Sequence, residues 1–264
     1  MSANQPLLKV EGVGIRFGGL LALKDISFSM NPGSITAVIG PNGAGKTTLF
    51  NCITGFYRPT FGQISIQSDN GYKSLEKMAI HDISRIGVAR TYQNIRLFGE
   101  MTALENLLVA QNRFVNRNLL AGIFKTKAFQ QSEMEAEERA WFWLRFMGLE
   151  DVANQAAGTL PYGQQRRLEV ARAMASRPKM ICLDEPAAGL NHKETEELND
   201  LILRLRDEHQ VSVMLIEHHM GVVMNISDHV IVLDHGEMIA SGTPKEVQKD
   251  PHVIKAYLGE DDVA

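Results

Sequence analysis

The spacing of hydrophobic and polar residues predicts two antiparallel strands at the start of the chain. Apolar and polar positions alternate in LLKVEGVGIRF and again in ALKDISFSM, as in strands with one buried face. The pairs Gly18-Gly19 and Pro32-Gly33 interrupt this pattern, and the chain is expected to turn there. A short apolar strand, ITAVIG, comes next. It is followed by a glycine-rich turn and a helix over about residues 46–54.

Two continuous apolar runs, MICLD and VSVMLIE, predict strands that are buried on both faces. Between them, residues 194–206 carry leucine and isoleucine at helical spacing. A strand, a helix and a strand in this order predict a parallel βαβ unit. The segment HVIVLDHGEMIASG then predicts a hairpin that turns at His235-Gly236.

The middle of the chain has a different pattern. Residues 97–158 include ALENLLVAQ and SEMEAEERAWFWLRFMGL, which predict helices, and carry no strong strand signal. We therefore predict a helical subdomain inserted into an α/β core. The core comprises residues 7–96 and 159–240, with a parallel sheet and an N-terminal antiparallel β part, and residues 241–264 form a helical tail with an acidic end. Residues 1–264 then make up a single domain.

Composition excludes some classes of function. The 264 residues are 44% hydrophobic and 22% charged, as in soluble globular proteins, and the net charge of −4 argues against a nucleic-acid partner. Cys52 and Cys182 lie in apolar stretches, which predicts small buried side chains rather than a disulfide or a metal site. No secretory signal is evident, and no apolar run approaches the roughly 20 residues that span a bilayer. Any membrane role is therefore expected to come through a partner.

The glycine-rich turn matches the P-loop pattern GxxxxGK[ST]. Its glycines let backbone N–H groups face a phosphate chain, and the next helix directs its positive end at the same oxygens. Lys46 is expected to reach the β- and γ-phosphates, and the Thr47 hydroxyl to ligate Mg²⁺. A chance match is the alternative, and the strand before and helix after the loop argue against it. The residues expected at the nucleotide are Gly40, Pro41, Asn42, Gly43, Ala44, Gly45, Lys46, Thr47 and Thr48.

An acidic pair follows the buried strand MICLD. Asp184 ends this strand, where its carboxylate can hold Mg²⁺ directly or through water. Glu185 comes next and can polarise a water molecule that attacks the γ-phosphate. An acidic strand end before a turn at Pro186 is the alternative, and the presence of a P-loop upstream favours the catalytic interpretation.

A third motif lies between the first two. Residues Leu160-Pro161-Tyr162-Gly163-Gln164, followed by QRRLEVARA, resemble the signature motif of ABC ATPases, which is usually LSGGQ. The same segment also suits an ordinary helix start with an apolar face, and both interpretations can hold. The resemblance implies that Leu160, Tyr162, Gly163 and Gln164 contact ATP bound to the P-loop of another chain.

Further landmarks of this family occur in order. The resemblance implies that Phe17 stacks on adenine, although a core phenylalanine of a strand is the alternative. Gln93 in RTYQNIRLF matches the Q-loop glutamine, which contacts Mg²⁺ and water and couples to membrane subunits. His218 in IEHHM matches the switch histidine that bonds the γ-phosphate, whereas His219 is expected to be a bystander. Residues 188–191 match the D-loop.

Whole segments are similar to the LivG-type ATPases of branched-chain amino acid importers, among them GKTTLFNCITGFYRPTFGQI, LDEPAAGLNHKE and SGTPKEVQKDPHVIKAYLG. The resemblance covers about residues 7–258. Alternatives within the clan are the LivF-type partner, a urea or amide importer ATPase and the lipopolysaccharide-export ATPase. A soluble ABC protein of translation or DNA repair is disfavoured by the single P-loop and the lack of heptads. A regulatory module is disfavoured because the catalytic set is intact.

The resemblance also implies a mechanism and partners. Two nucleotide domains sandwich two ATP molecules, with Lys46, Glu185 and His218 as the catalytic groups and Thr47, Gln93 and Asp184 at Mg²⁺. The implied partners are membrane-spanning permease subunits, a second ATPase of the LivF type or a second copy in a head-to-tail dimer, and indirectly a periplasmic substrate-binding protein. The implied location is the cytoplasmic face of the bacterial inner membrane.

Two residues depart from the family pattern. Pro161 stands where serine is usual, so it offers neither a hydroxyl nor a backbone N–H to a phosphate. Asn191 stands where the D-loop usually has aspartate, which removes a charge. We therefore expect the ATP site that uses this signature motif to be the weaker of two in a heterodimer.

Overall fold

The structure is a computed structural model, and it describes residues 5–114 and 126–258. These residues form two compact units. The first contains the chain up to Arg90 and from Lys179 onward, and the second contains Thr91–Pro178. The helical part expected over residues 97–158 falls within the second unit, except for residues 115–125, which lie outside the described residues. That all parts act as a single domain stays a prediction.

An antiparallel sheet of four strands opens the first unit, as the alternating pattern predicts. Its strands β1 (Leu8–Phe17), β2 (Leu20–Met30), β4 (Phe61–Ser68) and β5 (Gly71–Ser74) lie in the order β2-β1-β4-β5. Neither β4 nor β5 was predicted from sequence. Ile64 and Ile66 of β4 are completely buried, but Phe61 at its start is 43% exposed, so only two buried apolar positions mark this strand in the sequence.

The second sheet of this unit has six strands in the order β10-β9-β3-β8-β7-β6. Five of them run parallel: β9 (His229–Asp234), β3 (Ile35–Ile39), β8 (Ser212–Ile216), β7 (Met180–Asp184) and β6 (Val88–Arg90). The sixth, β10 (Glu237–Gly242), forms the predicted antiparallel hairpin with β9. The α/β class with a parallel core and an antiparallel part is confirmed.

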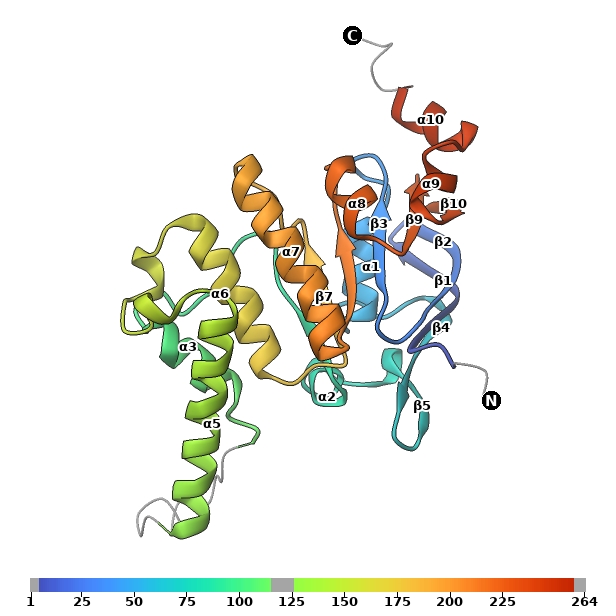
Figure 1. Ribbon diagram of the computed structural model, residues 1–264. Helices are drawn as coiled ribbons and strands as arrows, with labels where there is room; N and C mark the ends of the chain where they lie inside the picture. The colour runs from blue at the N-terminus through green and yellow to red at the C-terminus, as the bar shows by residue number, and fades with distance from the viewer. Residues whose placement is uncertain (1–4, 115–125, 259–264) are drawn as a thin grey trace. The chain divides into compact units, whose positions relative to one another are not determined.

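Helices cover both faces of the parallel sheet. The helix α1 (Lys46–Ile53) and the helix α7 (His192–His209) lie on opposite faces (Figure 1). The buried side of α1, which includes Leu49 and Phe50, joins both sheets in one apolar core. Two shorter helices, α2 (Ile80–Ile86) and α8 (Met220–Ile226), also belong to this unit, and α2 was not predicted from sequence.

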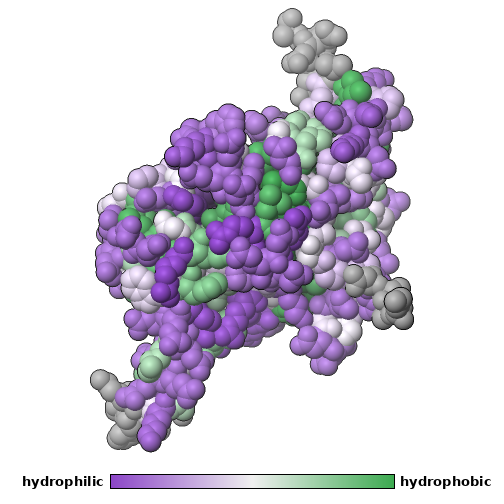
Figure 2. Space-filling view, in the orientation of Figure 1, coloured by the Kyte–Doolittle hydropathy of each residue, from purple (hydrophilic) through white to green (hydrophobic). Residues whose placement is uncertain are grey.

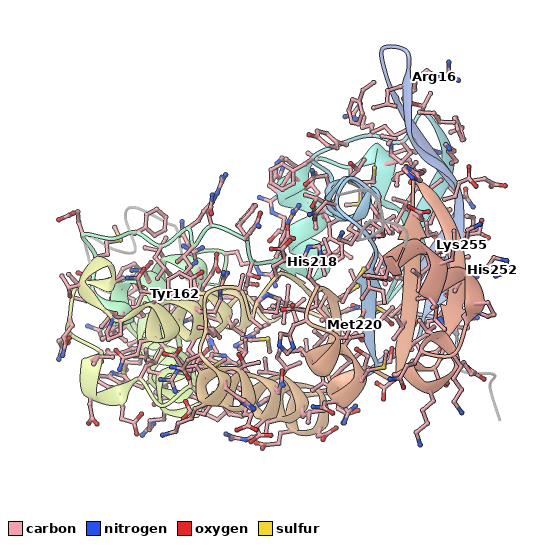
Figure 3. The ribbon with its side chains drawn as sticks, turned by 90° about the horizontal axis from the view of Figure 1, so that it is seen from above. Arg16, Tyr162, His218, Met220, His252 and Lys255 are labelled. Atoms are coloured by element: carbon pink, nitrogen blue, oxygen red, sulfur yellow. The ribbon has the colours of Figure 1, made fainter. Side chains whose placement is uncertain are left out.

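A helical tail was predicted over residues 241–264. Its first two residues belong to β10, and the helices α9 (Pro244–Val247) and α10 (Pro251–Leu258) follow. The helix α10 carries His252 and Lys255 (Figure 3). The acidic end expected over residues 259–264 lies outside the described residues.

The second unit is built from helices. Its helices α3 (Ala103–Ala110), α5 (Lys127–Phe146) and α6 (Tyr162–Ala175) pack against one another, with short 3₁₀ turns at Glu150–Val152 and Ala157–Thr159. Trp143 and Leu144 of α5 belong to its buried side chains. Thr102 and Glu105 form a capping box that starts α3.

Much of the surface on the face drawn in Figure 2 is hydrophilic. None of the helices within residues 5–114 and 126–258 combines the length and the hydropathy that crossing a membrane requires.

Candidate functional site

The phosphate-binding loop predicted from sequence connects β3 to α1. Two of its glycines are required by close packing and by backbone shape. Gly40 has φ of 144°, and a Cβ there would lie 1.9 Å from the carbonyl oxygen of Leu233. Gly45 has φ of 103°, and its Cβ would lie 2.7 Å from a side-chain carbon of Leu23. Only glycine fits at these positions without displacing neighbouring segments.

The Lys46 side chain returns to the loop from which it starts. Its ammonium donates hydrogen bonds to the carbonyl oxygens of Gly40, at 2.6 Å, and of Pro41, at 2.7 Å. Only 6% of this residue is exposed, so its positive charge lies inside the curve of the loop. This placement suits a group that binds phosphate oxygens at the start of α1.

A cavity of about 580 Å³ opens over this loop. It brings together the predicted residues Asn42, Gly43, Gly45, Lys46, Thr47 and Thr48 with Phe17, Glu185 and His218. It is also lined by residues that sequence reasoning did not select, namely Leu20, Leu21, Ala22, Lys24, His235 and Gly236. The lining thus combines an aromatic ring with a buried ammonium, which suits a ligand that has both a planar apolar group and an anionic group.

Phe17 lies at the outer part of this cavity and is partly exposed. Its ring meets that of Tyr57 edge to face, with the ring centroids 5.1 Å apart. Sequence reasoning missed Tyr57, because it lies in a loop without a recognisable motif. The alternative of a core position for Phe17 is disfavoured, since 43% of the residue is exposed.

The turn between β9 and β10 bonds both the phosphate-binding loop and β2. The backbone N–H of Gly236 donates to the carbonyl of Ala44 in the loop, at 3.1 Å. The carbonyl of Gly236 accepts from the N–H of Lys24 in β2, at 2.7 Å. A Cβ on Gly236 would lie 2.6 Å from the carbonyl oxygen of Ala22, so this close approach requires glycine.

The side chains of Glu185 and His218 are in contact at the carboxyl edge of the parallel sheet, and Figure 3 shows the position of His218. Glu185 directly follows β7, His218 lies two residues after the end of β8, and these two strands are parallel neighbours. The distance between His218 Nε2 and Glu185 Oε1 is 2.8 Å. Glu185 has a left-handed φ of 47°, which is rare for a residue with a side chain. Such backbone conformations occur often at functional sites.

Asp184 pairs with an arginine that sequence reasoning missed. Its Oδ2 lies 2.7 Å from a guanidinium nitrogen of Arg90, and the side chains are only 6% and 8% exposed, respectively. Arg90 also donates to Asn51 Oδ1, at 2.6 Å, and to Thr54 Oγ1, at 3.1 Å. Arg90 ends the three-residue strand β6, beside β7, and opens the segment RTYQNIRLF, of which sequence reasoning selected only Gln93.

Glu217 is a second buried carboxylate that sequence reasoning did not select. It follows β8 and is 3% exposed. It accepts backbone hydrogen bonds from Ala187, His218 and His219. Burial raises the pKa of the Glu217 carboxyl, and these donors oppose the change. His219 caps the start of α8.

The remaining predicted residues lie in the second unit, whereas the cavity is lined by the first. Pro161 is the N-cap of α6, Leu160 is buried and Tyr162 is partly exposed. The loop that carries Gln93 is held by buried charges of α6. Arg166 donates to the carbonyls of residues 92 and 93, and Glu169 accepts from the N–H groups of residues 92 and 96. Gly163 and Gln164 follow in the first turn of α6.

Asn191, noted as a departure from the D-loop pattern, is the N-cap of α7. Its Oδ1 accepts from the N–H of Glu194, and the Glu194 carboxylate accepts from the N–H of Asn191. The residue therefore has a structural role as one half of a capping box.

The donor set near the loop suits Mg²⁺ bound together with a phosphate. Within the described ranges no group of three or more histidine, cysteine or carboxylate side chains gathers as a metal cluster. The site instead offers the Thr47 hydroxyl in the cavity and the Asp184 carboxylate at the strand end. Mg²⁺ is usually held by one or two such groups, with phosphate oxygens and water completing its shell.

Comparison with known proteins identifies the family. A sequence model described as ABC transporter matches residues 23–188, which is more than half of the chain. The chain belongs to the ABC transporter family. A second model, described as branched-chain amino acid ATP-binding cassette transporter, matches residues 237–263 of this ABC ATPase.

Relatives with names extend this finding. The high-affinity branched-chain amino acid transport ATP-binding protein BraF of Pseudomonas aeruginosa is 55% identical over 97% of this chain and 99% of its own length. The corresponding protein LivG of Escherichia coli K12 is 50% identical over the same shares. A crystal structure of the ADP conformation of an ATP-binding cassette superposes with a TM-score of 0.82 and 33% identity, over 97% of this chain and 99% of that one.

Proposed function

We propose that this ABC ATPase binds and hydrolyses ATP in the cavity over the phosphate-binding loop. The loop from Gly40 to Thr48 surrounds the phosphates, and Lys46 neutralises their negative charge. Glu185 accepts a proton from the attacking water, and His218 orients that water and bonds the γ-phosphate. Because the groups are held in place before the reaction, they stabilise the developing charge without reorganising.

Mg²⁺ would be held by Thr47 and Asp184, and the contact of Gln93 with the ion stays a prediction from the family resemblance. The ion supplies positive charge to the β- and γ-phosphate oxygens when it is bound. Asp184 is already oriented by Arg90, so its carboxylate needs little further ordering. This assignment is supported by the types and positions of the oxygen donors.

Two further contacts complete the proposal, one with the adenine base and one with ATP that is held by a second ATPase. Phe17 stacks on adenine, with Tyr57 against its edge. The residues Leu160, Tyr162, Gly163 and Gln164 contact the γ-phosphate of ATP held by a second ATPase. The start of α6 can supply backbone N–H groups and its positive helix end for that contact.

ATP hydrolysis then drives import of branched-chain amino acids through membrane-spanning permease subunits. The names of the relatives and the C-terminal family match support this solute over urea, amides and lipopolysaccharide. The second ATPase is of the LivF type or a second copy of this chain, and a periplasmic binding protein delivers the solute. The chain works at the cytoplasmic face of the bacterial inner membrane.

The observation that carries the catalytic proposal is the contact between Glu185 and His218 beside the phosphate loop. Glu185→Gln should abolish ATP hydrolysis, because an amide cannot accept the proton, while ATP binding is retained. Phosphate release and binding of a fluorescent ATP analogue measure the two properties. Glu196→Gln on the exposed face of α7 is the matched control. Hydrolysis at the wild-type rate in Glu185→Gln would exclude this residue as the base.

Transport is tested separately in cells. Deletion of the gene should abolish uptake of radiolabelled leucine, isoleucine and valine, and the wild-type gene should restore it. Uptake of urea should not change. If the deletion left branched-chain amino acid uptake intact and reduced uptake of urea or an amide, the solute assignment would be wrong, although the ATPase assignment would stand.

A further inference from the structure

The buried carboxylate of Glu217 bonds two separate backbone segments at the edge of the parallel sheet. Its Oε1 accepts from the N–H of Ala187, at 2.9 Å. Its Oε2 accepts from the N–H of His218, at 3.2 Å, and more weakly from the N–H of His219, at 3.5 Å. One side chain thus joins the turn after β7 to the turn after β8.

These donors make a buried carboxylate possible at this position. Burying a charge is unfavourable unless it is hydrogen-bonded. In the described part of the chain, backbone N–H groups bond Glu217, and no ion pair reaches it. The nearby carboxylate of Glu185 adds to the rise in the pKa of Glu217 that burial causes. A smaller or apolar side chain at position 217 would avoid the cost of burying a charged group. The presence of glutamate there indicates that its hydrogen bonds to the backbone have a use.

The two segments joined by Glu217 carry the two proposed catalytic side chains. Ala187 lies two residues after Glu185, whose left-handed φ of 47° needs support from its surroundings. His218 itself donates one of the bonds. The distance of 2.8 Å between the side chains of Glu185 and His218 therefore depends on two backbone segments that Glu217 fixes.

We propose that Glu217 is a positioning residue for ATP hydrolysis, which holds Glu185 and His218 in the geometry that they need. It acts through the backbone and does not touch the nucleotide. This inference rests on the proposed function, because it assigns the water-activating groups to those two residues. Small displacements of catalytic groups lower rates strongly, so losing the bonds should slow the chemical step more than binding.

The test compares Glu217→Ala and Glu217→Gln with the wild type, using the purified full chain. Alanine removes all three bonds. Glutamine keeps the volume and one acceptor oxygen, but it directs an NH₂ group at N–H donors. We expect kcat to fall on the order of 10- to 100-fold in both variants. The KM for ATP and the affinity for a fluorescent ATP analogue should change little.

A matched control lies at the other end of the same strand. Ser212 is also buried, and its Oγ accepts from the backbone N–H of Gly33, at 2.8 Å. Ser212→Ala therefore removes a buried side-chain-to-backbone bond of β8 far from the carboxyl edge. It should lower the melting temperature without lowering kcat. If Glu217→Ala does not fold, Glu217→Gln carries the comparison, since it preserves the side-chain volume.

A second readout separates positioning from stability alone. In a His218→Ala background, Glu217→Gln should cause a smaller proportional loss in single-turnover hydrolysis, because one of its two targets is already absent. Equal proportional losses in both backgrounds, or a kcat of wild-type size in Glu217→Gln, would overturn the inference. If Glu185→Gln still hydrolysed ATP at the wild-type rate, the assignment of the catalytic base in the proposed function would fail. If only the Glu217 variants kept full activity, only this inference would fail.

Discussion

Replacing Arg90 with methionine should destabilise the first unit strongly. Methionine keeps a long apolar stem but removes the guanidinium that pairs with Asp184 at 2.7 Å. It also removes the donors to Asn51 and Thr54. The Asp184 carboxylate would then remain buried without its partner, since only 6% of its side chain is exposed.

The size of the expected loss of stability follows from the burial of Asp184. Removing one partner of a buried ion pair costs about 3–5 kcal/mol, because the remaining charge is uncompensated. In proteins of roughly this size each kcal/mol lowers the melting temperature by about 2–4 °C. Arg90→Met should therefore melt roughly 6–20 °C below the wild type.

Thermal unfolding followed by far-UV circular dichroism measures this shift. The double variant Arg90→Met Asp184→Asn should recover much of the loss, because the uncharged amide is less costly to bury. Arg85→Met is the control, because its pair with Asp82 is exposed and such pairs contribute little. A melting temperature of Arg90→Met within the range of this control would refute the reasoning, as would a double variant less stable than Arg90→Met.

Two further predictions concern the signature motif and the cysteines. Pro161→Ser gives α6 a side-chain cap worth about 1 kcal/mol, which thermal unfolding can detect. It also restores a hydroxyl for phosphate, so ATP turnover of the assembled transporter should rise, and an unchanged or lower rate would count against the weaker-site hypothesis. Burial raises the pKa of both Cys52 and Cys182 from 9.0 to about 12, so iodoacetamide at neutral pH should label them, by mass spectrometry, only after unfolding in urea. Because the unfolded thiols ionise first, stability should fall as pH rises from 9 towards 12, and less so in a variant with alanine at both positions.

The sequence predicted those parts of the fold whose signal is local. The strands β7 and β8 were found because parallel strands buried on both faces read as continuous apolar runs. The turn at His235-Gly236 was found because glycine ends a strand pattern there. By contrast, β6 has only three residues, and its place beside β7 depends on strand order, which no single segment reveals.

The same distinction applies to the candidate site. The phosphate loop and Glu185 belong to motifs with fixed spacing, and the structure places both at the cavity. Arg90 and Glu217 were missed because their partners lie far along the chain or are backbone groups. The sequence does not show which distant residue pairs with Arg90, nor that Glu217 bonds backbone N–H groups. Which residues bind ATP and Mg²⁺ stays a prediction that the proposed variants test.

Gly236 joins two backbone segments beside the cavity. Its N–H holds the phosphate loop at Ala44, and its carbonyl holds β2 at Lys24. These two bonds belong to consecutive peptide units, so the spacing between the phosphate loop and β2 is set by backbone groups rather than by flexible side chains. A ligand that contacts both segments must match a spacing that exists before it binds.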